Sequence, residues 1–273
     1  MLYLNDILNI VIKYDTILKK RNISMQTIYF TLQGKGGVGK TLISSYLMQY
    51  LLEKSDKKQK IKGIDTDPNN RSFRSIRKLD IEELPLFDEK QQINERNFDR
   101  MIEIFFENED TTFVVDNGAT SFLPLISYLV DNDIMEILKD KFNVVINIPI
   151  TGGEAQNDTL NGMQYIIETF KDNNISFNIW INEFFGKIIE DEKHFEEFEL
   201  YQKYKKLIHG IFSLPQVNQN TYGEDLKKMH KAKQTFKEVL LDTNYKFMEK
   251  QRLTNYKTKI FKTLELIIGQ EIK

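Results

Sequence analysis

The stretch from Gly34 to Thr41 reads Gly-Lys-Gly-Gly-Val-Gly-Lys-Thr and fits the pattern G-x-x-x-x-G-K-[ST]. Apolar-rich runs flank it at residues 28–32 and 42–48, as expected for a strand that turns through a glycine loop into a helix. Glycines let the loop backbone turn its N–H groups inward around an anion, and the positive end of the next helix points at the same place. The combination predicts a phosphate-binding loop.

Two side chains of this loop are expected to do chemistry. Lys40 should reach the β- and γ-phosphates of a nucleoside triphosphate such as ATP, and the Thr41 hydroxyl should coordinate Mg²⁺. The alternative is a glycine-rich turn without a ligand, which the complete pattern and its flanks disfavour. The residues expected to surround the nucleotide phosphates are Gly34, Lys35, Gly36, Gly37, Val38, Gly39, Lys40, Thr41 and Leu42.

Polar side chains also follow later apolar runs, at points where strands are expected to end. Asp65 and Asp67 come after the second strand, Asp116 after the third, and Asn182 after a later one. In an open parallel sheet, ligands bind at the carboxyl ends of the strands. We therefore expect these side chains to meet the glycine loop at one edge of the sheet.

The three carboxylates suggest a divided task. Asp116 follows Thr-Phe-Val-Val and has the form of a Walker B acid that holds Mg²⁺ directly or through water. A carboxylate in the turn that contains Asp65 and Asp67 is placed to orient the attacking water, and we assign this role to Asp67, with Asp65 supporting the metal. The alternative is that one of the two only caps a helix that begins near Asn70. The predicted metal ligands are thus Thr41, Asp65 and Asp116.

Hydrophobic periodicity predicts that strands and helices alternate. Strands are expected at residues 28–32, 61–64, 111–115, 142–148 and 177–181, and helices at 41–54, 121–130, 134–140, 154–172 and 192–208. An apolar segment at 211–215 follows, and further helices are expected from there to the C-terminus. Residues 71–110 are predicted to be mostly helical, with Phe98, Met101, Ile102, Phe105 and Phe106 on one face. Several strands are apolar throughout, which is typical of a mostly parallel sheet with helices on both faces. We expect an α/β fold in one domain.

Composition excludes several classes of site. The 273 residues include no cysteine, so disulfides, thiolate nucleophiles and cysteine-ligated Fe–S clusters are excluded. The net charge of -2 argues against a uniformly basic nucleic-acid coat. No apolar run approaches the ~20 residues of a membrane span, and the N-terminus lacks the basic region and cleavage site of a signal peptide. We expect a cytoplasmic protein.

Two terminal segments flank the expected domain, which we place at residues 25–244. Residues 1–24 carry apolar side chains near helical spacing and are interpreted as a helical extension, unless translation starts at Met25. Residues 245–273 are predicted to form a basic amphipathic helix. Its apolar stripe consists of Ile260, Phe261, Leu264, Ile267 and Ile268. Three interpretations stay open for this helix: packing on the domain, weak contact with DNA phosphates, or contact with an anionic membrane.

Lys35 has no task in an ordinary phosphate loop. Its position at the start of Lys-Gly-Gly-Val-Gly-Lys-Thr resembles the deviant Walker A motif of the ParA/MinD group, K-G-G-x-G-K-[ST]. In that group the signature lysine reaches across a dimer interface to the partner's nucleotide, which implies a catalytic role for Lys35 in addition to those expected of Lys40 and Asp67. The turn from Asp65 to Pro68 resembles the group's switch I, whereas Asp116-Asn117-Gly118 lacks the proline pair that is common in partition ATPases.

The resemblance narrows to the TraL/StbB branch, ParA-like ATPases encoded by conjugative and mobilisable plasmids, and it spans about residues 26–241. The segments that carry it are 32–35, 65–68, 94–99, 115–119, 151–153, 180–183 and 222–229. In the wider group an asparagine after a late strand reads adenine, which implies Asn182, and the loop with Leu214 and Pro215 is expected to close over the base.

The resemblance implies a P-loop NTPase of the SIMIBI type with helical extensions at both ends. Its activity would be the slow, partner-stimulated hydrolysis of ATP to ADP and phosphate, with Mg²⁺. An ATP-bound homodimer would act on a protein partner of a plasmid transfer or maintenance system. The alternatives are a partition or positioning ATPase that acts directly on DNA or membrane, and a P-loop ligase or kinase whose ATP turnover responds to an acceptor substrate.

Overall fold

The computed structural model describes residues 25–55 and 59–268 and is organised around a seven-stranded sheet. The order across the sheet is β3-β2-β4-β1-β5-β6-β9, and each of these pairs is parallel. The strands are β1 (Gln26–Thr31), β2 (Lys60–Asp65), β3 (Ile81–Glu83), β4 (Thr111–Asp116), β5 (Phe142–Thr151), β6 (Ser176–Asn182) and β9 (Ile208–Ser213). The predicted α/β fold with a parallel sheet is confirmed. The predicted helix at residues 1–24 lies outside the described residues.

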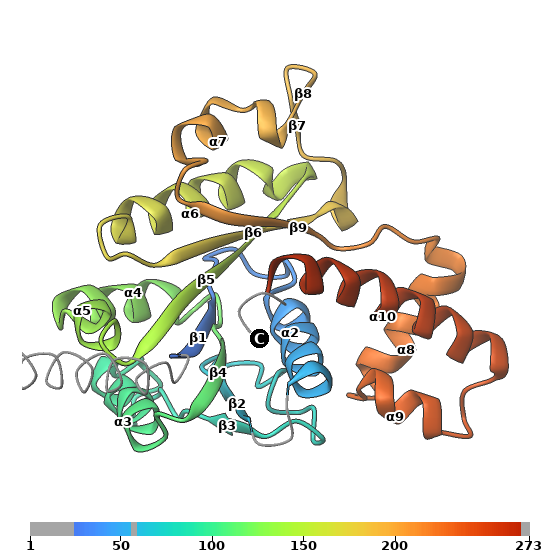
Figure 1. The fold of residues 1–273 in the computed structure, drawn as a ribbon, viewed down its shortest axis with the longest axis horizontal. Helices are drawn as coiled ribbons and strands as arrows, with labels where there is room; N and C mark the ends of the chain where they lie inside the picture. The colour runs from blue at the N-terminus through green and yellow to red at the C-terminus, as the bar shows by residue number, and fades with distance from the viewer. Residues whose placement is uncertain (1–24, 56–58, 269–273) are drawn as a thin grey trace, which may run out of the picture.

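Helices cover both faces of the sheet (Figure 1). One face carries α2 (Lys40–Lys54), α8 (Glu224–Lys231), α9 (Phe236–Leu241) and α10 (Phe247–Ile267). The other carries α3 (Asp99–Glu107), α4 (Phe122–Asp131), α5 (Ile134–Leu138), α6 (Gln156–Phe170) and α7 (Glu199–Tyr204). Because successive side chains of a strand point to opposite faces, Ile28 and Phe30 enter one core while Tyr29 enters the other.

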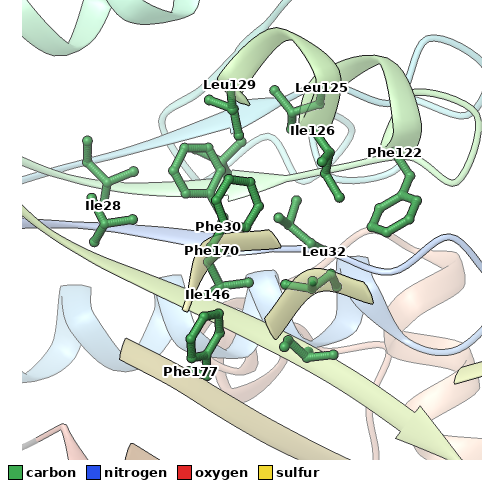
Figure 2. Close-up of a cluster of buried hydrophobic side chains, with 14 of the residues drawn as sticks. Ile28, Phe30, Leu32, Phe122, Leu125, Ile126, Leu129, Ile146, Phe170 and Phe177 are labelled. Atoms are coloured by element: carbon green, nitrogen blue, oxygen red, sulfur yellow. The ribbon is translucent and has the colours of Figure 1, made fainter. Parts of the chain in front are cut away.

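The core on the α4 and α6 side holds β1 in place just before the glycine loop (Figure 2). Ile28, Phe30 and Leu32 contact a cluster of buried side chains from neighbouring strands and helices. Phe30 also meets the ring of Phe105 edge-on, with ring centroids 6.2 Å apart. The strand that leads into the loop is therefore fixed by packing on both faces.

The last helix, α10, is part of the second core. It lies beside α2 (Figure 1), and Ile260, Phe261, Leu264 and Ile268 are buried against that layer. The Phe261 ring stands perpendicular to that of Tyr50 at 5.5 Å. These side chains of the predicted apolar stripe face the domain, so Phe261 is not free to enter a membrane. Within the described residues, no helix combines the length and the apolar character that a membrane span requires.

Two predicted helices are wrong for most of their length. Residues 71–94 form turns and the short strand β3, because this segment wraps around the sheet edge. Its first apolar side chains, such as Phe73 and Ile81, enter one core, and Leu84 and Leu86 enter the other.

The second wrong prediction is the helix at 192–208. Its first residues belong instead to a hairpin of β7 (Ile189–Glu190) and β8 (Lys193–His194), whose turn residues Asp191 and Glu192 have φ of 47° and 63°. Only α7 is α-helical in this region.

Candidate functional site

The glycine loop connects β1 to α2, and hydrogen bonds of the Gln33 side chain fix its start. The buried Gln33 amide donates to the carbonyls of Pro149 and Thr159, both at 3.0 Å, and its oxygen accepts from the Gly34 N–H at 3.0 Å. Gly39 ends the loop with φ of 99°, and an added Cβ would lie 3.1 Å from the Asn182 side chain. The loop conformation therefore requires glycine at residue 39 and is braced by β5 and α6.

Lys40, the first residue of α2, folds back over the loop. Its Nζ donates to the carbonyl oxygen of Lys35 at 2.9 Å, and the side chain is buried. Burial lowers the pKa of Lys40, and the nearby carboxylates of Asp116 and Asp67 oppose that shift. A buried ammonium group thus stands at the mouth of the loop, where an anion would be stabilised.

Thr41 and Ser44 of α2 both contact the end of β4. The Thr41 hydroxyl donates to Asp116 Oδ2 at 2.7 Å, and the Ser44 hydroxyl donates to Oδ1 at 2.9 Å. Burial raises the pKa of Asp116 to about 7, although the two hydroxyl donors act in the opposite direction. Ser44 was not among the predicted site residues, although its spacing of three residues from Thr41 places both on one helix face and could have indicated it.

Asp65 and Asp67 shape the turn after β2. Asp65 pairs in register with Asp116 on the neighbouring strand, and its carboxylate accepts from the N–H groups of Asp67 (3.0 Å) and Arg74 (2.8 Å). Burial raises the pKa of Asp65. Asp67 Oδ1 accepts from the N–H groups of Asn69 and Asn70, at 3.0 and 3.2 Å. Asp67 therefore caps this turn, and its role in orienting water stays a prediction.

The loop after β4 lies against the same turn. An added Cβ at Gly118 would stand 2.7 Å from Asp67 Cγ, so only glycine leaves room for the carboxylate. Thr66 and Ser121 each donate a hydroxyl hydrogen bond of 2.8 Å to Asn117 Oδ1, which is buried. Asn117, in the segment that departs from the partition-ATPase pattern, thus ties the β2 turn to the β4 loop.

The donor set around Thr41 and Asp116 fits Mg²⁺ better than a softer metal, because it offers a hydroxyl and carboxylates. In the part of the chain that the structure describes, no three acidic or histidine side chains cluster closely enough to hold a metal alone. Mg²⁺ commonly takes one or two carboxylates and completes its shell with water and substrate phosphates. Thr41, Asp116 and the adjacent Asp65 are the residues that would hold it.

Lys35 points away from its own loop. Its Nζ forms an ion pair with Asp158 Oδ2 of α6 at 2.7 Å, and both side chains are largely exposed. The structure thus separates Lys35 from the cluster that contains Lys40, Thr41, Asp65, Asp67 and Asp116. Nothing in the sequence marked Asp158, because it lies 123 positions from its partner.

A cavity of about 910 Å³ opens beside the glycine loop, and Leu42, Asn182 and Pro215 line it. The Asn182 amide donates to the Val38 carbonyl at 3.0 Å, and its oxygen accepts from the Phe184 N–H at 3.2 Å. Asn182 therefore supports the loop backbone from the floor of the cavity. The family resemblance implies that Asn182 and Pro215 lie at the base of the nucleotide; both line this cavity, and a contact with the base stays a prediction.

Residues 29–240 match the family described as the CobQ/CobB/MinD/ParA nucleotide binding domain. The chain is 37% identical over 242 residues to Protein TraL of Escherichia coli, covering 88% of this chain and 98% of that protein. A second Protein TraL from Escherichia coli is 35% identical over 242 residues, which again cover 88% of this chain and 98% of that protein. Among solved structures, a plasmid partition protein from Borrelia burgdorferi is 15% identical with a TM-score of 0.43, covering 76% of this chain and 97% of that one.

Proposed function

Because this chain belongs to the CobQ/CobB/MinD/ParA nucleotide-binding domain family, we propose that it is a Mg-ATP-dependent ATPase that dimerises with ATP bound. Its resemblance to TraL-type proteins supports a role as a switch in plasmid transfer or maintenance, with a protein of that system as partner. The observation that carries the proposal is the Thr41–Asp116 contact of 2.7 Å at the end of β4, next to a complete deviant loop.

Each polar group at the loop has a task in this proposal. Lys40 and the loop N–H groups bind the phosphates, and Thr41 and Asp116 hold Mg²⁺, which neutralises phosphate charge when bound. Asp67 lies in the turn beside Gly118, where its carboxylate would orient the attacking water. Positioning and electrostatic stabilisation account for most of the catalysis in phosphoryl transfer, so a precise arrangement of these groups matters more than any single reactive side chain.

Lys35 would act across the dimer. In the single chain it is paired with Asp158, and it has to leave this partner to reach the nucleotide of a second subunit. An exposed ion pair contributes only ~0–1 kcal/mol, so this release costs little compared with a contact to a triphosphate. Lys35 is thus free to change partners when the dimer forms.

We expect Lys35→Ala and Asp67→Asn to interrupt different steps. Lys35→Ala should bind ATP but stay monomeric, because its main contact lies across the interface. The Asp67→Asn side chain would still cap the turn through its amide oxygen, but without a carboxylate the turnover should fall by ~10²-fold or more while the ATP-bound dimer accumulates. Light scattering coupled to size exclusion, with and without ATP, measures the oligomer, and phosphate release measures turnover.

Lys90→Ala, which replaces an exposed lysine away from the loop, is the matched control and should behave as the unmodified protein. If all variants formed the same oligomer with and without ATP, the proposed ATP-dependent dimerisation would be wrong. Full turnover in Asp67→Asn would reduce Asp67 to a turn cap.

Asn182→Ala is expected to weaken nucleotide binding by about tenfold through loss of the Val38 brace. Since the lost contact supports the loop backbone, affinity for ATP and GTP should fall together. Titration of both nucleotides against both proteins measures this. A loss confined to ATP would instead place the Asn182 amide at the adenine base, as the family resemblance implies.

A further inference from the structure

The corner between α9 and α10 exposes a cluster of large apolar side chains. Leu240, Leu241, Phe247 and Met248 are 42%, 79%, 77% and 55% exposed and lie within nine positions of the chain. In Figure 1 this corner is at the outer end of the helical layer formed by α8, α9 and α10, away from the sheet. Four such side chains at one projecting turn are more than the scattered apolar residues expected on any surface.

The corner is held in shape from beneath. Val239 and Tyr245, on either side of Leu241, are buried in the core that contains α2 and α10. Lys250 Nζ donates to the Leu240 carbonyl at 2.9 Å, joining the end of α9 to the first turns of α10. The apolar side chains project because their neighbours are fixed inward, so their exposure belongs to the folded state.

The corner lies in the most basic part of the chain. Residues 227–262 contain eleven lysines and arginines against three acids, whereas the whole chain has a net charge of -2. Each of the three acids is engaged within the fold, and four of the eleven cations are paired with carboxylates as well. Glu238 caps α9, Asp242 accepts from Gln234 at 2.7 Å, and Glu249 pairs with Lys228 at 2.9 Å.

Cationic side chains share the face of the apolar ones. Lys237 precedes Leu240 and Leu241 by three and four residues, which places all three on one side of α9. On α10, Phe247 and Lys250 have the same three-residue spacing, and the ammonium group of Lys250 is held at this corner by the Leu240 carbonyl. The surface therefore combines projecting apolar side chains with lysines beside them.

We propose that this corner, defined by Leu240, Leu241, Phe247 and Met248, is a docking site for an anionic lipid surface. Lipid takes up projecting side chains without a complementary shape, and lysines at the headgroup level favour anionic membranes. A stable protein interface takes about 20–30 residues on each side, so a second copy of the chain would gain little from four. DNA phosphates would use the lysines but leave the apolar side chains in water. Nothing in this proposal depends on the nucleotide site.

Co-sedimentation of the full chain with vesicles tests the proposal. Binding is expected to vesicles of phosphatidylcholine with phosphatidylserine, and to be much weaker with phosphatidylcholine alone. Leu241→Ser and Phe247→Ser should each lower the partition coefficient by about tenfold, and Lys237→Gln by about fivefold on the anionic vesicles only. Leu123→Ser removes an apolar side chain that is 58% exposed on α4, on the other face of the sheet, and should change nothing. The melting temperatures of all variants should stay unchanged because the altered side chains are exposed.

Absence of binding to the anionic vesicles, or equal loss in Leu123→Ser, would overturn the lipid assignment. If the protein forms a dimer without lipid and Leu241→Ser dissociates it, the corner is instead a contact with a second copy of the chain. A third outcome is binding to duplex DNA without binding to vesicles. If Lys237→Gln weakens this binding and Leu241→Ser does not, the surface is a DNA contact. The effect of Lys40→Ala on ATP binding tests only the proposed function. It does not change the conclusion drawn from the vesicle experiment.

Discussion

Lys40→Ala is expected to lower the affinity for Mg-ATP by at least ten- to hundredfold. The substitution removes a charge-assisted contact with phosphate, worth ~1.5–3 kcal/mol. The effect should lie at the upper end of this range because Lys40 is buried, and a charge in a poorly solvated position interacts more strongly with an anion than one in water. Titration with a fluorescent ATP analogue measures the change.

Lys35→Ala provides the comparison within the same loop. Lys35 points toward Asp158 in the single chain. At protein concentrations that keep the protein monomeric, Lys35→Ala should therefore change the affinity for ATP by no more than about twofold. A melting curve without nucleotide shows whether Lys40→Ala remains folded, since Lys40 also donates to the Lys35 carbonyl. Unchanged ATP affinity in a folded Lys40→Ala protein would remove the basis for the nucleotide site.

The second large effect is expected from the loss of α10. Truncation after Asp242 removes a set of buried apolar side chains. They are Leu253, Tyr256, Ile260, Phe261, Leu264 and Ile268. At ~1.5–3 kcal/mol for each fully buried side chain, the loss from these six is roughly 9–18 kcal/mol, as large as the entire stability of a typical domain. The shortened chain should therefore fail to fold, or melt far below the intact protein in a circular dichroism scan.

Leu264→Ala is the graded form of the same experiment. Removing a fully buried leucine costs ~2–5 kcal/mol, which corresponds to a melting temperature lower by roughly 5–15 °C in a chain of this size. Lys262→Ala, two positions earlier and exposed, should shift it by no more than about one or two degrees. A truncated protein that melts like the intact one would instead make residues 245–273 an independent extension.

Local patterns in the sequence were enough to predict the glycine loop and five of the seven strands of the sheet, whereas β3 and β9 were not predicted. The spacing of Gly39, Lys40 and Thr41 is contained in consecutive residues, and the apolar runs of the strands need no distant information. The family resemblance drawn from these motifs is confirmed by the match over residues 29–240 and by the TraL relatives. The position of Asp116 beside the loop also followed, because parallel strands end at one edge of the sheet.

Other features depend on contacts between distant segments, and only the tertiary structure decided them. Residues 71–94 belong to a segment whose polar pattern predicted mostly helix, but wrapping around the sheet edge buries side chains such as Phe73 and Leu84 in different cores. Pairing with β2 supplies the hydrogen bonds that make Ile81–Glu83 a strand. Local propensity is a weak preference, and burial of apolar side chains overrides it.

The partners of Lys35 and of α10 show the same limit. Whether Lys35 contacts Asp158, and whether Phe261 faces Tyr50 or solvent, is set by segments more than a hundred positions away. A sequence determines which side chains are charged or apolar and how they are spaced along one element. Which of them are buried, paired or left exposed, as Leu241 and Phe247 are, depends on how the elements pack, because burial and pairing are properties of the surroundings.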